Sequence, residues 1–257
     1  MKKFAFTLFL SLMSASLIAQ DWHQVGMNFN DVDKKKIAVN NEGFVGMFIS
    51  DLGSNNGYFW VYDPNSMSWA EITGPFNSQT VQDMNLITDG NDFYIYYSVS
   101  SLDQFVWKIE PTTQNTTDYS LGLMNGIFSQ GATDLFMDRN SGDMYLVGLN
   151  GDLTDLNLMG WTGSNWDTLQ LDFMSAAGAG VSYVNMVSGY VNGTDVYIGV
   201  AANDGSFDGI GLFSTAIGTW NFQFANGLPN FSHTPQANHI DLAGVGSGYP
   251  IILSNNS

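Results

Sequence analysis

A repeat of about 50 residues runs through the chain and restricts its possible folds more than any other feature. Short apolar runs follow turns rich in glycine, asparagine or aspartate, and each run has an aromatic residue at a matching place: Phe44, Tyr94, Tyr145, Tyr197 and Tyr249. These aromatics are separated by 50, 51, 52 and 52 residues. A tryptophan late in most units has the same period: Trp22, Trp69, Trp166 and Trp220. Two independent markers with one period indicate a structural repeat.

Each unit has the pattern of four short strands. A first apolar run leads through a tight turn into the aromatic run, and a polar loop then leads to a third and a fourth run. The turn residues supply the positive φ angles that hairpins need, and no apolar period of 3.6 residues is present. The pattern predicts an all-β fold, a β-propeller of four-stranded antiparallel blades. The repeated aromatics are expected to fill the spaces between blades.

The strand count predicts five blades, of which the last is incomplete. Residues 236–257 supply the first two strands of a fifth unit, and residues 21–26 resemble a fourth strand that would complete it from the N-terminal side. A third strand for this blade is missing from the sequence. Either the fifth blade is three-stranded, or the chain is a C-terminally truncated piece of a longer protein. The end of the chain straight after an apolar strand favours truncation.

Two segments resemble known propeller repeats. Tyr58–Pro64, followed by Trp69, is similar to the third and fourth strands of kelch-type repeats, and Asp21–Gly26 resembles a strand common in secreted bacterial propellers. The Gly-Gly doublet that kelch repeats carry after their second strand is absent here. The resemblance implies the fold and no particular activity, because propellers carry many unrelated functions.

The first 19 residues have the features of a secretory signal peptide. Lys2 and Lys3 precede the apolar run Phe4–Ile18, and Ala19 supplies a small residue for cleavage. The run is short for a transmembrane helix, so membrane insertion is not expected. We expect residues 20–257 to form a single propeller domain that is secreted or held at the cell surface.

The composition excludes several classes of function. With 7 Lys+Arg against 24 Asp+Glu, the formal charge is -17, which repels nucleic acid and anionic lipid. The absence of cysteine excludes disulfides, thiolate metal sites and thiol nucleophiles. The only arginine is Arg139, so the arginine cluster of sialidase-type propellers cannot form. The three histidines do not have the spacing of a convincing metal site.

Four polar residues in or beside the first strands are candidates for ligand binding. In a propeller the first strand of each blade lines the central channel, and these residues are Asp83, Asp134, Asn185 and Asp241. One interpretation is a polar ring that contacts a ligand. Another is that the side chains satisfy backbone groups or hold water in a crowded channel. A catalytic pair is the third, since glycosidases use two carboxyl groups at a defined separation.

Two loops between second and third strands offer closely spaced oxygens for a metal ion. Their acidic residues are Asp152, Asp155, Asp204 and Asp208. Calcium takes six to eight oxygen ligands, but neither loop has the full EF-hand pattern, and solvated acidic turns are the alternative. The run Lys34–Lys36 is expected to be a charged strand edge that discourages aggregation.

The sequence favours a secreted binding module without catalytic activity, whose ligand is a glycan or a surface protein. The alternative is an extracellular hydrolase or lyase that acts on polysaccharide through carboxylates at the channel mouth. Calcium is the only cofactor that the sequence suggests. Neither nucleic acid nor membrane insertion is expected.

Overall fold

The computed structural model describes the chain from residue 32 onward with gaps, and its side chains as far as residue 200. The described ranges are 32–51, 55–123, 126–129, 132–138, 140–151, 154–176, 183–193, 195–203, 208–214, 221–224, 237–243 and 251–256. No helix in these ranges has the length and apolar character needed to cross a bilayer.

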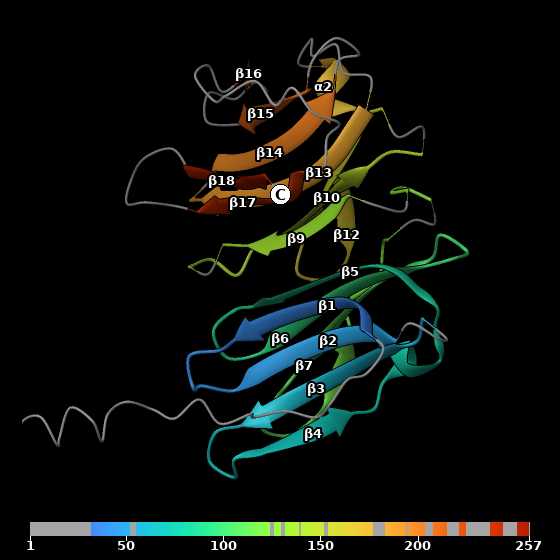
Figure 1. Cartoon of the computed structure of the whole chain (residues 1–257), viewed down its shortest axis with the longest axis vertical. Coiled ribbons are helices and arrows are strands. Elements are labelled where there is room, and N and C mark those ends of the chain that lie inside the picture. Colours follow the sequence, from blue (N-terminus) through green and yellow to red (C-terminus); the bar gives the residue numbers. More distant parts are fainter. Residues whose placement is uncertain are drawn as a thin grey trace, which may run out of the picture. The chain divides into compact units, whose positions relative to one another are not determined.

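The described strands form five antiparallel sheets, and each follows the order of the chain (Figure 1). The first sheet consists of β1 (Val32–Val39), β2 (Val45–Asp51), β3 (Gly57–Asp63) and β4 (Ser68–Ile72). The 3-10 turn η1 (Pro75–Ser78) leads into the second sheet. That sheet consists of β5 (Val81–Thr88), β6 (Phe93–Val99), β7 (Gln104–Ile109) and β8 (Thr116–Asp118).

The third and fourth sheets repeat this arrangement. The short helix α2 (Phe173–Ala176) lies between them in the sequence. The third consists of β9 (Thr133–Met137), β10 (Met144–Leu149), β11 (Leu156–Trp161) and β12 (Trp166–Gln170). The fourth consists of β13 (Tyr183–Asn192), β14 (Asp195–Asn203), β15 (Asp208–Ser214) and β16 (Asn221–Phe224). The fifth has two strands, β17 (Ala237–Ala243) and β18 (Ile251–Asn256).

The fold is the predicted β-propeller, and each four-stranded sheet is a blade. The first strands of consecutive blades pack together: β1 against β5, β5 against β9, β9 against β13 and β13 against β17. The described strands make four complete blades and the first two strands of a fifth, as the repeat predicts. The strand expected at residues 21–26 lies outside the described residues.

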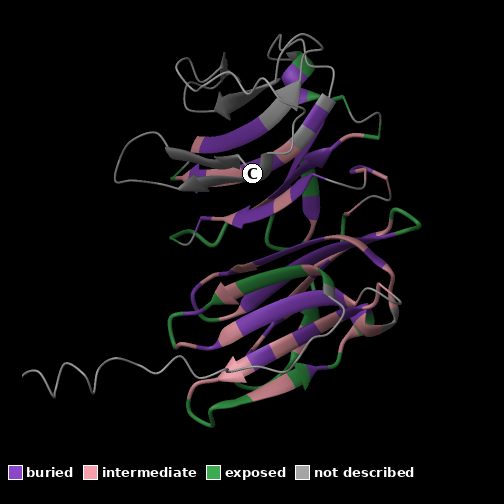
Figure 2. Cartoon of the chain, viewed as in Figure 1, coloured by how far each residue is buried: buried purple, intermediate pink, exposed green. Residues whose placement is uncertain are grey.

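Buried apolar side chains form three clusters, each shared by two consecutive blades. Figure 2 shows β2 buried along most of its length beside the largely exposed β1. Phe44 and Tyr94 belong to the clusters between blades one and two and between blades two and three. Trp166 is 2% exposed, and its Nε1 donates to the Tyr119 carbonyl of the preceding blade at 2.7 Å. Trp69 differs, because it is only half-buried and contacts the Tyr62 ring within its own blade. The prediction that these aromatics fill the space between blades therefore holds for three of these four residues.

The fourth strand of the second blade is short. β8 covers only Thr116–Asp118, whereas β4 and β12 have five residues each. Asp118 Oδ1 accepts the Ser120 N–H at 2.7 Å, and this turn ends the strand. Local side-chain chemistry therefore limits the length of this strand.

Candidate functional site

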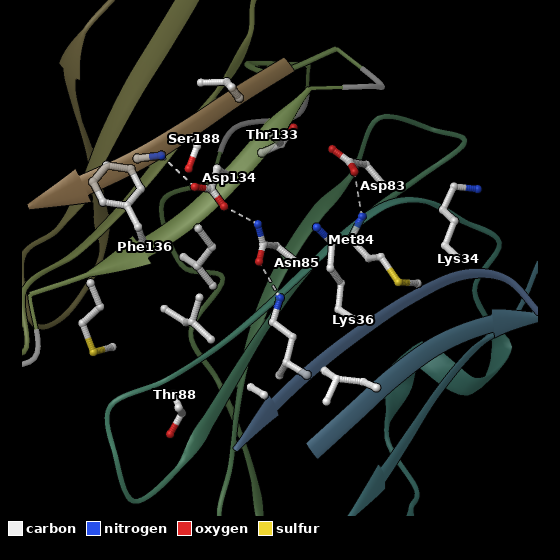
Figure 3. A pocket seen from close by; sticks show the side chains of 18 of the residues that line it. Lys34, Lys36, Asp83, Met84, Asn85, Thr88, Thr133, Asp134, Phe136 and Ser188 are labelled. Carbon is white, nitrogen blue, oxygen red and sulfur yellow. Dashed lines mark hydrogen bonds between the residues drawn. The ribbon is translucent and has the colours of Figure 1, made fainter. Parts of the chain in front are cut away.

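The first strands of the four complete blades surround a pocket of about 710 Å³. Strands β1, β5, β9 and β13 each contribute a wall, and Figure 3 shows residues from all four. This volume is in the range of small-molecule sites in proteins. The pocket therefore corresponds to the channel in which the sequence places its candidate ligand-binding residues.

Asp134, on β9, joins three blades at the pocket wall. Its Oδ1 accepts the side-chain N–H of Asn85 on β5, and its Oδ2 accepts the backbone N–H of Gly189 on β13 at 2.7 Å (Figure 3). A Cβ at position 189 would overlap the ring of Phe136, so only glycine allows this close approach without a shift of the ring. Both carboxylate oxygens of Asp134 are thus engaged in bracing the blades.

Asp83, on β5, has one oxygen bonded and one buried without a partner. Its Oδ1 accepts the Met84 N–H at 2.8 Å, whereas Oδ2 is inaccessible to solvent and accepts no hydrogen bond from the described residues. Burial raises the pKa of Asp83 to about 7. The Met84 N–H and the charges of Lys36 and Lys34 oppose this rise. Asp83 can therefore change its charge near neutral pH.

Further buried polar groups near Asp83 lack hydrogen-bond partners within the described residues. The Tyr96 hydroxyl, the Ser98 hydroxyl and Thr133 Oγ1 are inaccessible to solvent and form no hydrogen bond of ordinary geometry within the described residues. Burial, followed by the charge of Asp83, raises the pKa of the Tyr96 hydroxyl far above its usual range, so this group stays neutral. The surroundings of Asp83 therefore disfavour its charged form and leave hydrogen-bonding capacity unused.

Three lysines line the wall of the pocket that β1 contributes. Lys34, Lys35 and Lys36 lie on β1, which is the edge strand of its sheet, so the expected charged strand edge is present. This edge faces β5 and lines the pocket. Protection of an open edge is therefore not its only consequence, because Lys34 and Lys36 place positive charge beside Asp83.

Asp83 and Asp134 both line the pocket, but they occupy different register positions in their hairpins. The hairpin register places Asn85, Asp134 and Ser188 at matching positions, since each is opposite the residue two places after the repeat aromatic. Asp83 is opposite the residue four places after Tyr94, and Asp241 has the same register relative to Tyr249. Asn185 falls at a β-bulge in β13. The side chains of Asn185 and Asp241 are outside the described part of the chain.

Of the candidate calcium ligands, only Asp155 has a described side chain. Asp152 and Asp204 lie outside the described residues, and Asp208 is described only as part of β15. Asp155 is 3% exposed and accepts three backbone N–H groups, from Leu156 at 2.7 Å and from Met174 and Ser175 at 2.8 Å. No group of three His, Cys, Asp or Glu residues suited to a metal ion occurs among the described residues. Calcium in these two loops stays a prediction, and a melting temperature insensitive to EDTA would exclude it.

The contacts of Asp155 lead to a stability prediction. We expect Asp155→Ala to lower the free energy of unfolding by about 2 kcal/mol, because the N–H groups of Met174 and Ser175 at the start of α2 lose their acceptor. Urea unfolding of the variant and the wild type measures the difference. Asp167→Ala, at an exposed position of β12, is the control and should change stability by less than about 0.5 kcal/mol. Equal losses in both variants would contradict the assigned role of Asp155.

The pocket residues missed in the sequence are Asn85, Ser188 and the three lysines as pocket groups. The lysine run is visible in the sequence, but the sequence does not show that it lines the pocket. Asn85 and Ser188 could be found only from the hairpin register, because the turns between the first and second strands contain four, six and two residues in blades two, three and four. Counting back from the repeat aromatic therefore reaches a different position in each blade.

Solved structures of other proteins share the fold at very low sequence identity. An α-L-arabinanase from Penicillium chrysogenum complexed with arabinobiose is 9% identical with a TM-score of 0.53, and the match covers 91% of this chain and 78% of that one. The SapL1 lectin in complex with α-methyl fucoside is 14% identical with a TM-score of 0.52, covering 82% and 68%. An exo-β-1,3-galactanase from Phanerochaete chrysosporium with β-1,3-galactotriose is 12% identical with a TM-score of 0.51, covering 83% and 54%.

These similarities establish the β-propeller fold and leave the activity open. The chain spans only about half the length of the exo-β-1,3-galactanases that it matches, 46% and 54%. No family model matches the sequence, and no curated protein matches it. The kelch resemblance and the expected export are not tested by these similarities and stay predictions.

Proposed function

We propose that this chain is a glycan-binding propeller whose ligand enters the pocket between β1, β5, β9 and β13. The observation that carries the proposal is the fixed polar array in this pocket, where Asn85, Asp134 and Gly189 are linked across three blades. A preorganised array loses little conformational entropy when it binds a polyhydroxylated ligand. The expected export of the chain would bring the pocket into contact with extracellular glycans.

The solved structures support the proposal at the level of the fold. Three propellers of similar backbone are complexes with arabinobiose, α-methyl fucoside and β-1,3-galactotriose. They include both a lectin and glycosidases, so the fold by itself is compatible with binding alone and with catalysis.

The two carboxyl groups of the pocket favour binding over catalysis. A glycosidase needs one carboxyl group that donates a proton to the substrate and a second that acts as base or nucleophile. Asp134 uses both of its oxygens to hold Asn85 and Gly189, and Oδ2 of Asp83 is closed off from solvent. Neither group therefore has the exposed, free oxygen that the reaction needs.

A polysaccharide hydrolase is the second candidate, and one observation favours it. The pKa of Asp83 is raised to about 7, a value suited to a general acid at neutral pH. Such a role would require a ligand-induced movement that exposes Oδ2. If the wild type releases reducing sugar from any glycan and Asp83→Asn abolishes the release, the hydrolase hypothesis replaces the hypothesis of a non-catalytic binding module.

Binding is tested on a glycan array with the chain from residue 20 onward, followed by calorimetry on the glycans retained. We expect Asn85→Ala to weaken binding about ten-fold, because it removes a pocket amide and releases Asp134 from its position. The matched control is Asn65→Ala, at an exposed turn between β3 and β4, which should leave the affinity unchanged.

Two outcomes would contradict the proposal. One is the absence of retention of any glycan at micromolar concentration. The other is an equal loss of affinity in Asn85→Ala and Asn65→Ala, which would place the binding site outside the pocket. Circular dichroism of each variant confirms that the fold is retained before affinities are compared.

A further inference from the structure

The basic residues of this acidic chain are concentrated in the pocket. The sequence contains seven lysines and arginines, of which Lys2 and Lys3 belong to the predicted leader. Three of the other five are Lys34, Lys35 and Lys36, all lining the pocket. The whole chain carries a formal charge of -17. A concave site lined with charges of one sign concentrates ligands of the opposite sign.

The pocket lysines have few partners. Lys34 forms an ion pair with Asp33, whereas Lys35 and Lys36 are exposed and form no ion pair within the described ranges. Lys108, on the third strand of its blade, is different, because its Nζ lies 2.8 Å from Asp92 Oδ2 and 3.7 Å from Glu110 Oε1. The charge of Lys108 is therefore already compensated, whereas the charges of Lys35 and Lys36 are available to a ligand.

The wall opposite the lysines contributes little negative charge. Figure 3 draws Lys34 and Lys36 on the same side of the pocket as Asp83. The other acidic group among the described lining residues is Asp134, whose oxygens are engaged by Asn85 and Gly189. The described lining residues of β13 are uncharged. With Asp83 protonated, the described lining therefore holds three lysines and one carboxylate.

The pocket also lacks the usual platform for a neutral sugar. Its described lining contains one aromatic residue, Phe136, which is 6% exposed and stacks on Tyr145. A neutral saccharide gains much of its affinity by packing apolar C–H faces on exposed aromatic rings, and this contribution is small here. Charge and hydrogen bonds must supply the affinity instead.

We infer that the pocket selects anionic saccharides, with Lys35 and Lys36 binding the carboxylate or sulfate groups and Asn85 and Ser188 contacting the hydroxyl groups. This inference rests on the proposed glycan-binding function and names its ligand class. A long polyanion would be repelled by the acidic remainder of the protein. The ligand is therefore a short anionic glycan or the end of a chain that enters the pocket.

The inference includes a pH dependence that follows from the groups in the pocket. Among the described lining residues, these are the three lysines on β1, Asp83 on β5 and Asp134 on β9, and the described part of β13 adds no titratable side chain to the lining. Protonation of Asp83 near pH 7 removes a negative charge beside Lys34 and Lys36. Affinity for an anionic ligand should therefore rise as the pH falls from 8 to 6, and Asp83→Asn should remove most of this dependence.

The test uses calorimetry with three probes of similar size: an oligogalacturonate, a sulfated galacto-oligosaccharide and the neutral galacto-oligosaccharide. We expect the wild type to bind at least one anionic probe about ten-fold more tightly than the neutral one at low salt. The variant Lys35→Gln/Lys36→Gln should lose about ten-fold in affinity for that probe and keep its affinity for neutral sugar. The control Lys108→Gln, which also removes positive charge, should change either affinity less than two-fold.

Each result has a defined meaning. Equal or tighter binding of the neutral probe, or an unaffected double lysine variant, overturns the inference and leaves glycan binding standing. Absence of binding to all probes and to the glycan array overturns the proposed function as well. Preference for the carboxylated or the sulfated probe identifies which anionic group the lysines bind.

Discussion

Replacement of Asp83 by Asn is expected to raise the free energy of unfolding at pH 8 by about 4 kcal/mol. Burial raises the pKa of this carboxyl from 3.8 to about 7 in the folded chain, so the folded state holds its proton over a pH range in which the unfolded state has lost it. The stability contribution of the protonated group is complete below pH 4 and is lost as the pH rises toward 7. Asn has the same shape, carries no charge and can still accept the Met84 N–H.

Urea unfolding at pH 5 and pH 8 measures this effect. The wild type should lose about 2–3 kcal/mol more between these two values than Asp83→Asn does, since each pKa unit corresponds to about 1.4 kcal/mol. The two proteins differ only at position 83, so the difference between their pH profiles isolates Asp83. Asp167→Asn, at an exposed position, should follow the wild type at both pH values. Parallel pH profiles for Asp83→Asn and the wild type would show that Asp83 is ionised in the folded chain throughout this range.

Removal of the Asp134 carboxylate is expected to cost about 3 kcal/mol of stability and most of the ligand affinity. Asp134→Ala leaves the Asn85 amide and the Gly189 N–H without their acceptor, and a buried donor that loses its partner costs about 1–3 kcal/mol. Because the two donors belong to different blades, the loss loosens the walls of the pocket as well. Urea unfolding and calorimetry with the retained glycan measure the two effects.

Asp143→Ala is the control for this variant, because Asp143 is exposed in the turn between β9 and β10. Its stability should differ from the wild type by less than about 0.5 kcal/mol. The double variant Asn85→Ala/Asp134→Ala adds a sharper criterion. Its loss should be smaller than the sum of the two single losses by about 1 kcal/mol, since both single changes break the same hydrogen bond. Additive losses would mean that this bond does not couple the two blades energetically.

The sequence predicted the blades well because each blade is largely local. Alternating strands joined by turns with residues such as Gly90 (φ 105°) and Gly142 (φ 80°) specify hairpins within one unit. The repeated aromatics then report which faces are buried against the next unit. The exception, β8, is short because the Asp118 side chain ends it, a contact that the period does not encode.

The candidate site was predicted less accurately for a geometric reason. Asp83 and Asp134 each precede their repeat aromatic by 11 residues, which makes them look equivalent in the sequence. The intervening turns differ in length, however, so Asp83 lies two register positions away from Asn85, the true counterpart of Asp134. The lysine run was identified as a strand edge, and only the packing of β1 on β5 places that edge in the pocket.

By itself the sequence determined the period, the strand content and the acidic surface charge of this protein, because these depend on residue type and spacing along the chain. Tertiary structure alone decided which polar groups meet. It joined Asn85, Asp134 and Gly189 across three blades, buried one oxygen of Asp83 and set three lysines around the same pocket. These contacts link residues about 50 apart, and their geometry depends on hairpin register and blade packing, which local sequence patterns do not specify.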